Sequence, residues 1–241
     1  MSQGNFAPRN RLLAAIGKEH WERLEDLLEP VELPLGHVLF DAGAILDRVY
    51  FPEAGVISTV APFSDGPPAE MATTGREGVV SIAAALGAER AFSRHMVQVP
   101  GAALTMDIRA FREAQRTLPG FQDLLHTYAR AFMAQVMQSV ACNAVHSVEE
   151  RCARWLLMCR DRSEGDRFLL TQEFLAEMLG VSRASVNLVA RTLQGAGLIR
   201  YSRGGITILD REGLEDSACE CYRQVRDLYQ ETLPLSFGDQ P

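Results

Sequence analysis

The spacing of apolar residues changes twice along the chain, and each change predicts a different kind of element. Apolar side chains recur at helical intervals over residues 8–30, up to Pro30, which predicts a helix. From residue 31 to about 107, short apolar runs alternate with Gly, Pro and Asp turns, as in closely spaced antiparallel strands. We place these strands at 31–36, 37–40, 48–51, 55–60, 70–73, 95–99 and 103–106. The pattern predicts an α+β chain with an N-terminal antiparallel β-roll.

Helical spacing returns after residue 107. A short helix over 108–118 ends before Pro119-Gly120, and a long helix runs from Phe121 to about Asn143. Between Asp123 and Glu149 the one charged residue is Arg130, so this helix must bury most of its surface. Its apolar faces can pack on the β-roll or on the same helix of a second copy.

The stretch from Thr171 to Ile208 has the pattern of a helix-turn-helix followed by a β-hairpin wing. Thr171 and Ser182 are good N-caps, because their hydroxyls can accept orphan backbone N–H groups. Gly180 stands where a helix needs a left-handed residue after its end. The second helix, over 183–194, has apolar residues at i, i+3, i+4 and i+7, namely Val186, Val189, Ala190 and Leu193. Two helices joined by so short a turn cross steeply, and this geometry presents the second helix to a DNA major groove.

Charge supports this interpretation. The whole chain has a formal net charge of −7, yet no Asp or Glu occurs between Val181 and Leu209. The basic residues of that stretch are Arg183, Arg191, Arg200 and Arg203. A basic island in an acidic protein is what a phosphate-facing surface requires. The alternative, a helical hairpin with a solvated face, does not explain the missing acids, the Gly204-Gly205 tip or the paired caps.

Two further helices flank this stretch. Ser147-Val-Glu-Glu150 is a capping box, so a new helix begins there, directly after a hinge at residues 144–147. After the wing, the helical pattern over residues 210–230 predicts one C-terminal helix.

The chain resembles the Crp/Fnr family of bacterial transcription regulators. In the C-terminal part the resemblance rests on Ser182-Arg183, Val186, Leu193 and Gly197-Leu198-Ile199, and in the N-terminal part on Gly36, Leu39, Gly43, Tyr50 and Gly55. It implies a cyclic-nucleotide-binding-like, cupin-like sensor β-roll over 1–118, a dimerisation helix and hinge over 119–145, and a winged helix-turn-helix over 146–241. It also favours a homodimer held by the long helix, with contacts at Leu125, Tyr128, Phe132, Val136 and Val140.

The resemblance implies a recognition helix over 183–194 that enters the major groove of a palindromic site. We expect Arg183 to contact guanine and Asn187 to contact a base edge, with adenine preferred. The phosphate candidates are Thr171, Gln172, Ser185, Arg191, Arg200 and Arg203. Relatives that read the best-known half-site have a Glu after the Arg and a second Arg further on. Here Ala184 and Leu188 stand at those places, so the bases read there should differ.

The stretch Gly75–Gly87 resembles the family's phosphate-binding cassette, in which helix N-terminal amides and an Arg hold a cyclic phosphate and a Glu holds the ribose. The match is poor, because the expected Arg-Ser/Thr-Ala is absent. The nearest candidates for an effector pocket are Glu77, Arg90, Ser93 and Arg94. Cyclic nucleotide binding is therefore disfavoured, and we expect a degenerate pocket that takes another ligand or none. A haem-responsive regulator of the same fold is a further alternative, because an axial His leaves little trace in sequence.

The five cysteines are interpreted as reduced, buried thiols. They are Cys142, Cys152, Cys159, Cys219 and Cys221, and none has C-x₂-C spacing. Cys152 and Cys159 could form a redox pair, whereas Cys219-Glu-Cys221 is too short to make a tetrahedral metal site alone. No two histidines have metal-ligand spacing on one element, and the N-terminal cysteine cluster of the family's iron–sulfur branch is absent. The sequence thus predicts no metal ligand, and the cofactor stays unassigned.

Other classes of protein are disfavoured. The chain has no P-loop, no G-x-S-x-G and no isolated carboxylate pair in an apolar setting, so we expect no enzyme. It begins without a signal pattern and has no run of 18 apolar residues, which predicts a cytoplasmic protein without membrane contact. The expected partners are double-stranded DNA, a second copy and RNA polymerase, with a small-molecule effector as a candidate. The competing class is a ligand-binding or scaffold protein whose helical tail binds protein.

Overall fold

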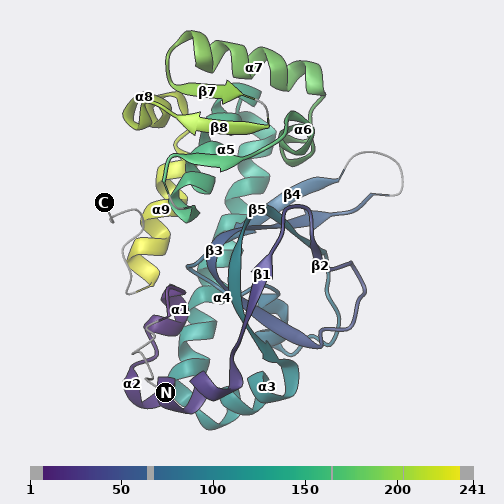
Figure 1. Ribbon diagram of the computed structural model, residues 1–241, viewed down its shortest axis with the longest axis vertical. Helices are drawn as coiled ribbons and strands as arrows, with labels where there is room; N and C mark the ends of the chain where they lie inside the picture. The colour runs from purple at the N-terminus through teal and green to yellow at the C-terminus, as the bar shows by residue number, and fades with distance from the viewer. Residues whose placement is uncertain (1–7, 64–67, 164, 203, 234–241) are drawn as a thin grey trace.

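The computed structural model describes residues 8–63, 68–163, 165–202 and 204–233. A twisted antiparallel sheet and its helices form one end of the molecule, and a smaller three-stranded sheet with the C-terminal helices forms the other (Figure 1). The long helix α4 (Pro119–Val145) runs between the two ends. The α+β class and the order of roll, long helix and helix-turn-helix are as the sequence predicts.

The N-terminal helical region is broken into pieces, which corrects the single helix expected over 8–30. It comprises α1 (Arg11–Ala14), α2 (Lys18–Leu24) and the 3-10 turn η1 (Glu25–Leu27). Gly17, the N-cap of α2, separates the first two with a φ of +79°, a positive value that glycine adopts without strain. Pro30 lies within the first strand instead of stopping a helix.

The sheet is built on two long strands where the sequence suggested several short ones. Its strands are β1 (Glu29–Leu33), β2 (Val38–Phe40), β3 (Arg48–Ala61), β4 (Ala69–Thr74) and β5 (Arg94–Asp107). They pair antiparallel in the order β1-β5-β3-β4, with β2 also on β5. Strands β3 and β5 continue through their glycines because register shifts absorb the bend. A Cβ on Gly101 would lie 2.2 Å from the Ala54 carbonyl oxygen, so only glycine permits this close crossing.

Aromatic packing joins the helices to the roll. Helix α3 (Ile108–Thr117) and α4 contribute Phe111 and Phe121, whose rings meet edge to face at 5.8 Å, and Phe51 of β3 lies beside both. Further along α4, Tyr128 is fully buried against Gly78, where an added Cβ would lie 2.1 Å from the ring. The short 3-10 helix η2 (Ile82–Leu86) follows this contact. Helix α4 is therefore fixed on the roll by ring contacts that leave no spare volume.

The second end begins at α5 (Val148–Arg162), where the Ser147 capping box is present as expected. Its other elements are β6 (Arg167–Leu169), α6 (Gln172–Leu179), α7 (Arg183–Gly195), β7 (Ile199–Ser202), β8 (Gly205–Ile208), α8 (Arg211–Ser217) and α9 (Cys221–Thr232). The helix expected over 210–230 is two helices, because the chain is extended at Ala218 (φ −86°, ψ 151°). Helix α9 returns along α4, and its Tyr229 packs beside Tyr128.

Polar contacts connect the two ends. The Nε of Arg162, in α5, donates to Glu77 Oε1 at 2.7 Å, and both side chains are only 2% exposed. The Nη2 of Arg162 donates to Gln135 of α4 at 3.3 Å. A second contact joins Trp155 of α5, whose Nε1 donates at 2.8 Å, to Glu70 of β4. Among the described residues, no helix has the length and apolar character to span a membrane.

The Glu70 contact generates a pH dependence of stability. Burial raises the pKa of Glu70 from its ordinary value of 4.5 to about 7, while the hydrogen bonds from Ser58 and Trp155 act the other way. Between these pH values the folded protein keeps a proton that the unfolded chain loses. The free energy of unfolding therefore falls as the pH rises from about 4.5 to 7.

We expect Glu70→Gln to keep both hydrogen bonds and to remove this dependence. The variant should be more stable than the parent at pH 8 by roughly 1–2 kcal/mol, less than the full pKa difference implies because the residue is only half-buried. Urea unfolding at pH 5 and pH 8 measures the effect. Equal stabilities of parent and variant at pH 8 would contradict it.

Candidate nucleic-acid interface and hinge cluster

The helix-turn-helix predicted from the sequence is formed by α6 and α7. The Oγ1 of Thr171 accepts the Phe174 N–H at 3.2 Å, and Ser182 accepts the Ser185 N–H at 3.2 Å. Gly180 ends α6 with a φ of +64°. The apolar residues Val186, Val189, Ala190 and Leu193 of α7 are buried. The recognition helix therefore occupies 183–195, one residue longer than expected.

Helix α7 lies at the outer edge of the molecule (Figure 1). Arg183, Ala184 and Arg191 are exposed, whereas Ser185 and Asn187 are half-buried. Leu188, which the sequence analysis did not count as a contact, is 68% exposed between them. An exposed leucine on a polar helix face can contact a thymine methyl group. On α6, Thr171 and Gln172 are half-buried at the N-terminus, where a phosphate can bind.

The wing follows as the hairpin β7–β8, to which β6 adds a third strand. Gln194 of α7 fixes the hairpin to the helix, because its Oε1 accepts the Tyr201 N–H at 2.9 Å. Arg200 is exposed and lies opposite Thr207 in the register of β7 and β8. On the other side of β8, Thr207 lies opposite Arg167 of β6, which is also exposed. Directly paired residues project from one face of a sheet, so Arg167 joins the basic surface. Arg203 lies outside the described residues.

The four effector-pocket candidates do not form one site. Glu77 is buried, takes the guanidinium of Arg162 and also accepts the Gly75 N–H at 3.1 Å. Arg90 donates to the Gly43 carbonyl at 2.8 Å, and Arg94 pairs with Asp41 at 2.6 Å. Ser93 is buried. The Glu77 carboxylate joins α5 to the roll, so the structure does not bring it together with these arginines, and their role in an effector pocket stays a prediction.

The dimer candidates on α4 divide into two faces. Leu125 and Tyr128 are fully buried inside the chain, so their assignment to the dimer contact is wrong. The face of α4 that carries these two side chains packs on the roll, so a second copy of the chain cannot contact them. Val140 is 67% exposed, while Phe132 and Val136 are half-buried. Met133 and Met137, which are 59% and 66% exposed, lie on the same side of the helix. We call this apolar surface the α4 stripe; its members are Phe132, Met133, Val136, Met137 and Val140.

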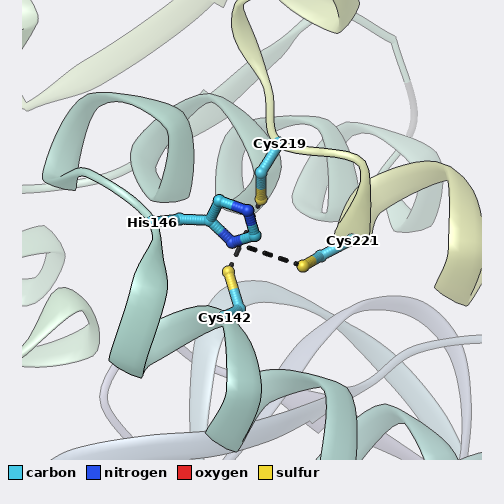
Figure 2. Close-up of side chains that lie close together, drawn as sticks. All are labelled: Cys142, His146, Cys219 and Cys221. Carbon is cyan, nitrogen blue, oxygen red and sulfur yellow. Dashed lines mark hydrogen bonds between the residues drawn. The ribbon is translucent and has the colours of Figure 1, made fainter.

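The structure also assembles a cluster that the sequence analysis did not find. Cys142 and His146 come from the end of α4 and the hinge, and Cys219 and Cys221 from the α8–α9 junction (Figure 2). One ligand atom from each of the four residues lies within 4.8 Å of the other three. We call these residues the hinge cluster. The signal in the sequence was the pair Cys142 and His146, four residues apart on one helix, which places both on one face.

Hydrogen bonds order this cluster. The sulfur atoms of Cys142 and Cys219 are 3.5 Å apart, and Cys221 Sγ is 3.5 Å from His146 Nδ1. The hydrogen bond from Cys219, with the Arg154 guanidinium acting in the same direction, lowers the pKa of the Cys142 thiol to about 5. Cys152 and Cys159 are buried in α5, and burial raises the pKa of Cys152 to about 12. They stay structural thiols, as expected.

Comparisons with known proteins agree with this geometry. Residues 150–217 match the family model of the Crp-like helix-turn-helix domain. The CRP-like cAMP-activated global transcriptional regulator of Mycobacterium tuberculosis is 28% identical over 207 residues, which cover 78% of this chain and 87% of that protein.

Solved structures share the fold. FixK2 from Bradyrhizobium japonicum matches with a TM-score of 0.67 at 13% identity, over 80% of this chain and 98% of that one. The c-di-GMP responsive global regulator CLP of Xanthomonas campestris matches with a TM-score of 0.62 at 15% identity, over 79% and 98%. The chain thus carries a Crp-like helix-turn-helix domain and has the same fold as these transcription regulators.

Proposed function

We propose that the chain is a homodimeric, sequence-specific DNA-binding regulator that reads a palindromic site with α7. The observation that carries this proposal is the outward position of α7, basic and free of acids, in a domain of the Crp-like type. Arg183 is at the first position of that helix and exposed, as a bidentate contact to guanine requires. Arg191, Arg200 and Arg167 are placed to contact phosphates, which position the protein without specifying sequence.

The α4 stripe supports the dimer. Met133, Met137 and Val140 are each more than half exposed on a helix that carries almost no charge. A two-fold partner covers such a stripe with its own copy, and brings two recognition helices to half-sites about 34 Å apart. The proposal places the protein in the cytoplasm, with RNA polymerase as the protein partner.

Regulation by a ligand is the second element of the proposal. The Mycobacterium relative is named as cAMP-activated and the Xanthomonas one as c-di-GMP responsive, so one architecture serves different effectors. In this chain a cyclic nucleotide would have to displace Arg162 from Glu77, which would leave a buried guanidinium without its carboxylate. We therefore assign no cyclic nucleotide, and an effector would act by binding one arrangement of α4 and α5 better than another.

The first test is DNA recognition. Selection from random duplexes should recover a palindrome, and Arg183→Ala should lose roughly 5- to 150-fold of its discrimination at one base pair of each half-site. Arg200→Ala should weaken binding evenly across sequences and reduce the salt slope by about two for the dimer. Arg109→Ala, on α3 at the far end, is the matched control with unchanged binding. If Arg183→Ala keeps full sequence preference, the assignment of roles is wrong.

The second test is the dimer. Met137→Glu places a charge in the α4 stripe, and its desolvation should shift the mass in light scattering toward that of the 26.6 kDa monomer. DNA affinity should fall with it, because two half-sites are then bound separately. Gln224→Glu adds the same charge at an exposed position of α9, away from the stripe, and should stay dimeric. A dimer that persists in Met137→Glu would place the contact elsewhere.

A further inference from the structure

The hinge cluster has the composition and spacing of a metal site. We propose that Cys142, His146, Cys219 and Cys221 bind one Zn²⁺ ion in a closed, four-ligand structural site that fixes the hinge between α4 and the DNA-binding domain. Three cysteines and one histidine form a standard ligand set for structural zinc. The set contains no carboxylate, so it disfavours Mg²⁺ and Ca²⁺, which bind through oxygen.

The distances support a single tetrahedral ion. Zinc–sulfur bonds of about 2.3 Å and zinc–nitrogen bonds of about 2.0 Å at tetrahedral angles separate two sulfurs by about 3.8 Å, and a sulfur from a nitrogen by about 3.5 Å. The observed separations are 3.5 Å for Cys142 and Cys219, and 3.5 Å for Cys221 and His146. All four ligand atoms lie within 4.8 Å of one another. An iron–sulfur cluster distributes its ligands over two or more irons, and so needs a wider arrangement.

The surrounding side chains orient the ligands. The Nδ1 of His146 faces the sulfurs (Figure 2). Its Nε2 lies 3.2 Å from the Glu220 carboxylate. This carboxylate holds the proton on Nε2 and leaves the Nδ1 lone pair for a metal, as in carboxylate–histidine–zinc arrangements. The amide Nε2 of Gln138 donates to Cys221 Sγ at 3.0 Å. Such hydrogen bonds fix a thiolate in position.

The charge of the site is also balanced. Three thiolates and one Zn²⁺ carry a net charge of −1, and the Arg154 guanidinium acts on Cys142. Arg154 is only 8% exposed, and its Nε and Nη1 have no hydrogen-bond partner among the described residues. A buried cation with unsatisfied donors needs nearby negative charge. The thiolates of a loaded site supply it.

The position of the site predicts its structural role. Cys142 and His146 belong to the end of α4 and the hinge, while Cys219 and Cys221 flank the break between α8 and α9. One ion therefore links the end of α4 to the α8–α9 junction across the hinge. The helix α5 and the helix-turn-helix extend from this hinge. Both C-terminal ligands lie beyond residue 217, where the match to the family model ends.

Metal analysis of the full-length protein, purified with zinc in the medium, tests the proposal. The wild type should contain one zinc per chain, and so should Cys152→Ala, which removes a buried thiol outside the cluster. Cys219→Ser should lose most of the metal. Replacement of zinc by Co²⁺ should give the visible absorption of tetrahedral cobalt and a thiolate-to-cobalt charge-transfer band in the near ultraviolet.

A milder variant distinguishes loss of a metal ligand from misfolding, either of which would remove zinc from Cys219→Ser. Glu220→Gln alters only an exposed carboxylate and should weaken zinc affinity by about 10- to 100-fold, measured by competition with a chelator. Glu231→Gln, an exposed acid on α9, is its matched control and should bind as the wild type does. Wild-type protein without metal, with iron in place of zinc, or with a disulfide between Cys142 and Cys219 would overturn the proposal. None of these measurements uses DNA, so they stand apart from the DNA-binding proposal.

Discussion

The buried pair of Arg162 and Glu77 holds the architecture together. Arg162 is in the last turn of α5, Glu77 is in the roll, and Gln135 of α4 binds the same guanidinium. Removing one partner of such a pair leaves an uncompensated buried charge, at a cost of about 3–5 kcal/mol. The roll, the long helix and the DNA-binding domain therefore all meet at this pair. Gly75 permits it, since a Cβ there would lie 2.6 Å from the Arg162 side chain.

The same pair occupies a carboxylate of the roll. A carboxylate that the Crp/Fnr resemblance associates with ribose binding is here part of the contact between domains. Tyr128 closes the space over Gly78, and Tyr229 of α9 packs beside it. Any signal that reaches the DNA-binding domain must change how α4, α5 and the roll meet. Because these surfaces are close-packed, they favour a few discrete arrangements over gradual deformation.

Helix α9 makes a further contact between the two ends of the molecule. It leaves the winged domain at Cys219 and Cys221, passes the hinge and packs along α4, where Val225, Tyr229 and Leu233 join the core of the roll. The C-terminal segment is thus continuous in sequence with the DNA-binding domain and packed in space against α4. The hinge cluster at the start of α9 and the contact of Tyr229 with Tyr128 near its end connect the hinge to the rest of the molecule. The hinge cluster lies where the end of α4, the hinge and the start of α9 meet.

The sequence alone determined what depends on neighbouring residues. Helical spacing, the caps Thr171, Ser182 and Ser147, and the acid-free stretch identified the helix-turn-helix and its recognition helix almost to the residue. These features are local, because a cap or an amphipathic face is complete within one or two turns. The length of α4 and the class of fold followed in the same way.

Tertiary structure decided what depends on how those elements meet. It buried Leu125 and Tyr128, joined Glu77 to Arg162, and exposed the α4 stripe. It also broke the C-terminal helix at Ala218 and brought Cys219 to Cys142, a residue 77 positions earlier. No spacing rule within either segment encodes such a contact, since it exists only once α9 has packed against α4. Local periodicity specifies the elements and their faces, whereas the choice among possible partners for each face depends on the complete packing.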